Sequence, residues 1–317
     1  MKLKNLALLG LLALLWGPSF LFIKVAVAEI PPISLVVGRV GIAFMLLYGL
    51  LRLRGGRLPA WGTTWRHLAI VALFHNSLPF VLLSWGEQHI DSALASIVNG
   101  GTPIFTILLA HLMTSDDKLT RFKALGVVLG MSGLVLLASP TLVAGVQATT
   151  LGLLAVVLVS ASYGLAIVYT RKHLRGLPSL VAPTAQMLLA TLYLLPLALL
   201  IDRPFSLPTP SLQATASLVA LGLLGTTLAF IVYYRLLESA TASYASMVTY
   251  LVPVVGVILG VLVLGEQLTW HAYAGFALIL LGVMVVNGAL QDLRRRWLPV
   301  AQAKHRAEPL DEGVYPH

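Results

Sequence analysis

The chain has 317 residues, of which 58% are hydrophobic and only 10% are charged, and its mean hydropathy is +0.90. These values lie well outside the range of soluble domains and predict an integral membrane protein. The net charge of +9 does not indicate nucleic-acid binding, because the basic residues lie in short clusters between apolar runs, where membrane topology explains them. The sequence contains no cysteine, which excludes disulfides and cysteine-based metal or redox sites.

Ten apolar runs follow one another, each long enough to cross a hydrocarbon core about 30 Å thick. They predict an all-α membrane protein, because a transmembrane barrel would show a weaker, alternating pattern. The short loops, rich in Pro and Gly, suit tight connections between neighbouring helices and leave no room for a soluble domain. The predicted spans are Leu6–Ala28, Ile33–Leu53, His67–Gln88, Asp91–Thr114, Arg121–Ser139, Thr149–Tyr169, Pro178–Ile201, Leu212–Leu237, Ala240–Leu264 and Trp270–Leu290.

The first span resembles a signal peptide, because lysines precede an apolar run that ends in the small residues Ala26-Val27-Ala28. We expect a retained helix instead. Trp16 and Lys24 in this span match Tyr163 and Arg171 at the same spacing in a later span, so the first span is one unit of a repeat and belongs to the mature bundle.

The basic residues predict the orientation, because Lys and Arg are retained on the cytoplasmic side. The N-terminal segment, every second loop and the tail hold nearly all of the basic residues, whereas the loops on the other side hold little beyond Arg203. We therefore expect an inner (plasma) membrane protein with both termini in the cytoplasm. Residues 291–317 lack hydrophobic periodicity and are predicted to form a short disordered cytoplasmic tail. The cytoplasmic set comprises Lys2, Lys4, Arg52, Arg54, Arg57, Arg66, Lys118, Arg121, Lys123, Arg171, Lys172, Arg175 and the arginines of the tail.

Two copies of one pattern lie in the chain, at Ala93–Leu137 and Ser243–Val286. Because each copy belongs to a unit of five spans, an odd number, the second unit must enter the membrane in the opposite direction. We predict two inverted repeats, residues 1–140 and 141–290, a plan that recurs in secondary transporters with the substrate site at the interface between repeats. In the alignment Ala95, Ser96, Val98 and Pro103 match Ala245, Ser246, Val248 and Pro253; after a one-residue slip, Gly126 and Gly133 match Gly275 and Gly282.

The segments LLWGPSFLFIKVAV, GRVGIAFMLL and LVPVVGVILGVLVLGEQLTWHAYAGFALILLGVMVV resemble the drug/metabolite transporter (DMT) superfamily, in particular its ten-helix EamA-type exporters. The resemblance covers the chain up to Leu290. It implies ten helices in two inverted five-helix repeats (5+5) that export small metabolites by alternating access; family members of similar length and layout include exporters of aromatic amino acids. The chain departs from the pattern at one corner, where Ser115-Asp116-Asp117 replaces the Gly265-Glu266 of the second copy.

Polar groups at membrane depth are costly unless they face a cavity or a partner, so they mark candidate binding residues. Ser96 and Asn99 share one helical face with Pro103, and the second copy repeats that face. The alternative for the serines is close helix packing through interhelical hydrogen bonds, whereas Asn99 and Tyr250 favour a cavity. The candidate substrate-binding residues are Trp16, His75, Asn76, Ser96, Asn99, Tyr163, Gln186, Ser246, Thr249 and Tyr250.

His75 is the one histidine that the predicted spans place near the midplane. A lone histidine is most often a hydrogen-bonded packing residue, and substrate contact is the alternative. A role in proton coupling lacks a neighbouring carboxylate in the sequence. The matched aromatic residues Trp16 and Tyr163 suit stacking on an aromatic substrate, although such residues also anchor helices at the membrane interface.

Hinges are expected where Pro103 and Pro253, near Gly100, Gly101 and Gly256, weaken the backbone ladder at matching places in both copies. A static kink is the alternative.

Lys24, Arg39 and Glu87 are candidate gate or structural charges. Because an arginine at the centre of a membrane helix costs about 2.5–3.5 kcal/mol, we expect Arg39 near the outer face, paired with Glu87 or Asp91.

No Asp or Glu lies near the middle of a predicted span, which disfavours a proton-driven exporter of cationic drugs. A nucleotide-sugar carrier would need paired basic residues in the cavity, and only Arg39 and Lys24 are available. An intramembrane enzyme would need facing carboxylates, a metal cluster or an activated nucleophile, and the spans indicate none. We therefore expect a non-enzymatic exporter of aromatic or hydrophobic amino acids, with other metabolites or drugs as the alternative, that needs no cofactor or metal and works as a single chain in lipid.

Overall fold

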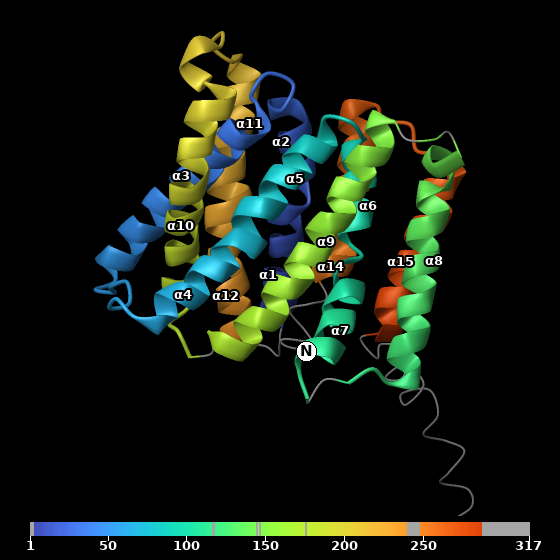
Figure 1. Cartoon of the computed structure of the whole chain (residues 1–317), viewed down its shortest axis with the longest axis horizontal. Helices are drawn as coiled ribbons and strands as arrows, with labels where there is room; N and C mark the ends of the chain where they lie inside the picture. The colour runs from blue at the N-terminus through green and yellow to red at the C-terminus, as the bar shows by residue number, and fades with distance from the viewer. Residues whose placement is uncertain are drawn as a thin grey trace, which may run out of the picture.

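The computed structural model describes residues 3–115, 118–143, 145, 147–174, 176–239 and 248–286, with side chains described up to residue 236 before the last gap. Within these ranges the chain is a bundle of long helices without strands (Figure 1). Eight helices are long and apolar enough to cross a membrane, and two shorter apolar helices follow them. The protein is an all-α, multi-pass membrane protein of ten helices, as the sequence predicts. Ser246 and the predicted tail lie outside the described residues.

Several spans are built from more than one helical segment. In chain order the segments are α1 (Leu3–Trp16), α2 (Pro18–Ala26), α3 (Pro32–Leu53), α4 (Thr63–Val71), η1 (Ala72–Ser77), α5 (Leu78–Glu87), α6 (Ser92–Asn99), α7 (Thr102–Met113), α8 (Arg121–Val143), α9 (Ala148–His173), α10 (Val181–Leu197), η2 (Ala198–Asp202), η3 (Pro204–Ser206), α11 (Leu212–Gly222), η4 (Leu223–Leu228), α12 (Ala229–Ser239), α14 (Val248–Leu264) and α15 (Trp270–Val286).

The breaks within spans follow from glycine and proline. α1 ends at Trp16 because Gly17 is a weak helix former and Pro18 carries no backbone N–H. The fourth span is likewise interrupted at Gly100-Gly101, between α6 and α7. Pro253, by contrast, lies inside the continuous helix α14. The matching positions therefore differ: the first copy is interrupted there, whereas in the second the helix continues through the proline because neighbouring helices hold it in place. The hinge role of both positions stays a prediction.

α8 and α15 pack along each other at one side of the bundle (Figure 1). Their backbones touch at glycines: a Cβ built on Gly126 would lie 2.6 Å from the carbonyl oxygen of Gly282, and one on Gly275 would lie 2.7 Å from that of Gly133. Small residues permit this approach in membrane helices. The two contacts exchange under the sequence alignment of the copies, which is the relation that an inverted two-fold repeat requires.

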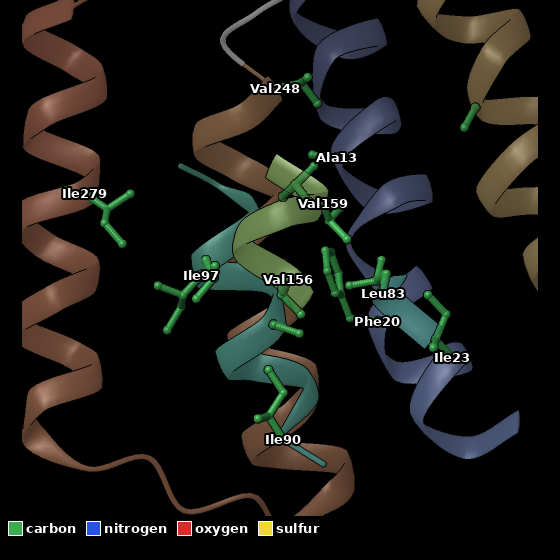
Figure 2. Packing of buried hydrophobic residues seen from close by; sticks show 14 of the residues in the cluster. Ala13, Phe20, Ile23, Leu83, Ile90, Ile97, Val156, Val159, Val248 and Ile279 are labelled. Atoms are coloured by element: carbon green, nitrogen blue, oxygen red, sulfur yellow. The ribbon is translucent and has the colours of Figure 1, made fainter. Parts of the chain in front are cut away.

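Buried aliphatic and aromatic side chains from several helices meet around α6 (Figure 2). Phe20 of α2, Ile97 of α6 and Val156 of α9 belong to this cluster and are nearly or fully buried. Because lipid tails are as apolar as these side chains, their close packing rather than the removal of water holds the helices together. The cluster fixes α6 and α9 next to the spans that carry the polar residues described below.

Candidate functional site

The third span widens into a π-helical turn, η1, directly before Pro79. In a π-turn each N–H bonds to the carbonyl five residues earlier, so the missing N–H of Pro79 leaves the carbonyl of Phe74 without its backbone partner. Ser162 of α9 donates its hydroxyl to that oxygen at 2.6 Å. Ser77 Oγ donates to the carbonyl of Ala72 at 3.1 Å. The widened turn is therefore satisfied locally and held against α9.

His75 and Asn76 lie on this turn. The ring of Tyr163 from α9 meets the His75 ring edge-on, with centroids 5.5 Å apart, and Phe230 of α12 lies at 6.3 Å. Gln186 of α10 is within reach of the same imidazole. Among the described residues neither His75 Nδ1 nor the amide atoms of Asn76 have a hydrogen-bond partner, although Asn76 is 0% exposed.

Arg39 of α3 lies next to this group. It is 5% exposed, its Nε donates to Thr226 Oγ1 at 2.9 Å, and its guanidinium carbon lies 3.9 Å from the centre of the Phe80 ring. Thr226 lies in η4, another π-turn, and donates its own hydroxyl to the carbonyl of Leu221 at 2.9 Å. The expectation that Arg39 forms an ion pair with Glu87 or Asp91 is wrong. In the described structure the guanidinium is held instead by a hydroxyl and an aromatic face.

We call the following residues the aromatic–polar cluster. It brings together three predicted site residues, with Asn76 beside them, and Arg39, a predicted gate or structural charge. Phe80, Phe230 and Thr226 were not among the predicted site residues. The cluster consists of Arg39, His75, Asn76, Phe80, Tyr163, Gln186, Thr226 and Phe230.

Trp16 reaches the edge of this cluster through α12. Its ring lies 5.6 Å from that of Tyr233, and Tyr233 and Phe230 are three residues apart, so they share a helical face. One face of α12 therefore carries a ring beside Trp16 and a ring beside His75. No sequence pattern separates Phe230 and Tyr233 from the aromatic residues of other spans, but their spacing of three is a signal that could have found them.

Ser96 and Asn99 lie elsewhere, in a contact between α6 and α14. A Cβ built on Gly256 would lie 2.5 Å from Ser96 Cβ, and one on Gly100 would lie 2.6 Å from Pro253 Cγ. The Ser96 hydroxyl donates to the carbonyl of Ala93 at 2.7 Å. Ser96 thus packs directly against α14, which is the packing alternative for the serines, and its counterpart Ser246 lies outside the described residues.

Three other predicted residues belong to this region. Asn99 Oδ1 is buried and has no hydrogen-bond partner among the described residues. Tyr250 donates its hydroxyl to the carbonyl of Val283 in α15 at 3.0 Å, and Thr249 precedes it in α14. The structure thus divides the predicted binding residues between the aromatic–polar cluster and the α6–α14 contact.

Lys24 links α2 to the turn between α5 and α6, at the end of the bundle away from the N-terminus (Figure 1). Its Nζ donates to the backbone carbonyls of Glu87 and Ile90, both at 2.7 Å. The carboxylate of Glu87 is 0% exposed, and neither of its oxygens has a hydrogen-bond partner in the described ranges. Lys24 and Glu87 therefore meet through the main chain of Glu87 rather than through its side chain.

Glu266 fastens the same turn from the other copy. Its two carboxylate oxygens accept from the backbone N–H groups of Ser92 and Ala93 at 2.8 Å each, at the N-terminus of α6, where a negative charge is favoured. Burial and the nearby Glu266 raise the pKa of Asp91 above its ordinary value, while Lys24 acts in the opposite direction. The α5–α6 turn is thus held by one basic and one acidic side chain.

The sequence matches the profile of the EamA-like transporter family twice, over residues 4–139 and 150–288. It is similar to the transporter YoaV of Bacillus subtilis, with 26% identity over 88% of this chain and 95% of YoaV. It is also similar to the inner membrane transporter YedA of Escherichia coli K12, with 25% identity over 87% of this chain and 88% of YedA.

A third relative is the probable terminal-alkyne amino-acid exporter of Streptantibioticus cattleyicolor, with 28% identity over 88% of this chain and 92% of that protein. Among solved structures, a crystal structure superposes with a TM-score of 0.63 at 18% identity, covering 90% of this chain and 98% of the other. The superposition supports the fold alone.

Proposed function

The chain belongs to the EamA-like transporter family, and on that premise we propose that it exports aromatic and other apolar amino acids across the inner membrane. The observation that carries this proposal is the aromatic–polar cluster, where His75 lies between the rings of Tyr163 and Phe230. Edge-on ring contacts are favourable for a further aromatic ring, and unpartnered amides such as Asn76 suit the polar end of an amino acid. The relative named as an amino-acid exporter supports the same substrate class.

We further propose that transport proceeds by alternating access between two inverted repeats, residues 1–140 and 141–290. The α6–α14 contact would open and close at hinges formed by Gly100, Gly101, Pro103, Pro253 and Gly256. Lys24 and Glu87 would act as a gate at the α5–α6 turn, where Lys24 already connects two helices. In this arrangement Thr249 and Tyr250 of α14 would border the path that opens.

The orientation belongs to the same proposal. Both termini are placed in the cytoplasm, because the basic segments gather on that side. A relative named as an inner membrane transporter supports the choice of membrane. Since both repeats lie on one chain, a single copy is expected to transport.

Counterflow in proteoliposomes tests the proposed function. Vesicles loaded with unlabelled tryptophan, phenylalanine or tyrosine should accumulate the labelled amino acid faster than protein-free vesicles. Loading with leucine or with an amino sugar tests the apolar and aromatic preference in the same assay. If the aromatic amino acids exchange no faster than in protein-free vesicles, the substrate proposal is wrong, whereas membership of the transporter family is unaffected.

A further inference from the structure

Arg39 holds a charge deep within a membrane helix and uses only part of its hydrogen-bonding capacity. It is the eighth residue of α3, about 10 Å from the helix start at 1.5 Å per residue. A guanidinium has five N–H donors. Within the described residues only Nε–H has an acceptor, the hydroxyl of Thr226, so the four N–H groups on Nη1 and Nη2 are unpartnered.

The charge of Arg39 also has no partner of opposite sign in direct contact. No described carboxylate forms an ion pair with it. Glu87 acts on Arg39 only through space, and Lys24 affects that carboxylate more strongly than Arg39 does. A buried cation without an ion pair is costly in a membrane helix, and charged residues inside membrane helices mark substrate or ion pathways.

The surroundings of Arg39 fit a specific kind of ligand. A guanidinium presents its paired N–H groups as a planar fork that matches a carboxylate. The ring of Phe80 covers one face of the fork and Tyr163 lies within electrostatic range. Rings therefore adjoin the charge on the side of His75 and Phe230, where the side chain of an aromatic or apolar amino acid would be placed.

We propose that Arg39 binds the carboxylate of the transported amino acid, and that the protein therefore selects amino acids over the amines that lack the carboxylate. This inference rests on the proposed function and specifies the polar end of its substrate. It assigns Arg39 to substrate binding rather than to a gate. The competing role is a structural link from α3 to η4 through Thr226, which would affect all substrates alike.

Matched substrate pairs separate the two roles. Counterflow is measured with tryptophan and tryptamine, phenylalanine and phenethylamine, and leucine and isoamylamine. The native protein should prefer the acid of each pair by about 10- to 100-fold, the size expected for charge-assisted hydrogen bonds. In Arg39→Gln this preference should fall to near unity. Arg39→Lys, which keeps the charge without the fork, should give an intermediate ratio.

Thr226→Val is the matched control, because it removes the acceptor of Nε but leaves the charge in place. Its acid-to-amine ratio should equal that of the native protein even if its overall rate is lower. An unchanged ratio in Arg39→Gln, or an equal loss for acid and amine, overturns the inference and leaves the structural link. For variants that fold but do not transport, the rise in melting temperature caused by the acid is compared with the rise caused by the amine. This comparison replaces the acid-to-amine transport ratio.

The outcome for the proposed function is read separately. If only the leucine pair is exchanged, the aromatic preference is wrong, and the leucine ratio alone decides the role of Arg39. If the aromatic amino acids are exchanged with an unaltered ratio in Arg39→Gln, the proposed function stands and the inference fails. If none of the six compounds is exchanged or stabilises the native protein, both fail.

Discussion

Two of the three described π-turns, η1 and η4, occupy matching places in the two copies and differ in the residues that they carry. η1 presents His75 and Asn76, whereas η4 presents Gly225 and Thr226 at the same positions. A Cβ on Gly225 would lie 2.5 Å from the hydroxyl of Ser19, so α2 packs directly against η4. In η1 the corresponding place is filled by an imidazole between two aromatic rings.

Each turn also receives a polar side chain from the opposite copy. Arg39 of the second span bonds to Thr226 in η4, and Gln186, at the matching place in the seventh span, reaches His75 in η1. The two connections join matching positions, but the side chains differ: Arg39 is cationic, whereas Gln186 is neutral. The difference teaches that the repeated backbone sets where polar side chains meet, while the unlike residues at those places give the site its charge and its aromatic character.

The largest effect should follow from placing a large side chain in the smaller turn. Gly225→Leu would force a side chain into Ser19, and we expect a loss beyond the 1–3 kcal/mol usual for overpacking, with little folded protein recovered. His75→Leu at the matching place should remain folded. Size-exclusion chromatography and thermal melting in detergent measure both. Equal recovery of the two variants would show that the turns are packed alike.

A smaller effect is expected from the hydroxyl that satisfies η1. Ser162→Ala leaves the Phe74 carbonyl buried without a partner, which should destabilise the protein by about 1–3 kcal/mol. The double variant Ser162→Ala/Pro79→Ala has a backbone N–H at residue 79, which can donate to the Phe74 carbonyl and should restore most of the lost stability. η4 needs no such rescue, because Ala229 N–H bonds to the carbonyl of Leu224. If the double variant melts at the same temperature as Ser162→Ala, Pro79 is not the reason that the Phe74 carbonyl lacks a backbone partner.

The ring of His75 should contribute less to substrate affinity than Arg39. His75→Ala removes one aromatic contact, worth about 0.5–1.5 kcal/mol, so the affinity for aromatic amino acids should fall by roughly 2- to 12-fold. His75→Phe keeps a ring and should retain most of that affinity. Competition in the counterflow assay gives both values. Tighter binding by His75→Ala would mean that the imidazole obstructs the site rather than lines it.

The smallest effect is expected at Glu29, which lies outside both turns and gives a reference for the size of the other effects. The hydroxyl and N–H of Ser211 donate to its carboxylate at 2.6 Å each and lower the pKa of Glu29. Because the folded pKa is lowered, this stabilisation is present above the unfolded pKa and is lost as the pH falls through the folded value. Glu29→Gln should therefore melt slightly lower near neutral pH and match the native protein in acid. A gap that widens in acid would contradict this sign.

The spans and the repeat could be predicted from sequence because both depend on local composition. Runs of apolar residues define membrane helices, and Gly126 matches Gly275 once the alignment of the copies includes a one-residue slip. The break at Gly100-Gly101 follows in the same way from the weak helix propensity of glycine.

The partner of Arg39 and the ring neighbour Phe80 could not be predicted, and only the spacing of three between Phe230 and Tyr233 points to those two rings. In a soluble helix the apolar stripe shows which face is buried. In a membrane both the lipid-facing and the buried face of a helix are apolar, so the hydrophobic pattern does not predict how each helix is rotated about its axis. The π-turns η1 and η4 could not be predicted for a related reason. Pro79 explains η1 once the turn is seen, while nothing equivalent follows Leu228 at the end of η4.

The glycine contacts between α8 and α15 bear on how such unlike turns arose. Gly126 meets Gly282, and their counterparts Gly275 and Gly133 meet in the same way, so the interface is isologous, like that of a two-fold homodimer, although it lies within one chain. In a true homodimer any substitution appears twice, and a histidine in one turn would force a histidine into the other. Covalent fusion of the copies removes that restriction. It allows a symmetric scaffold to hold a substrate that has no symmetry of its own.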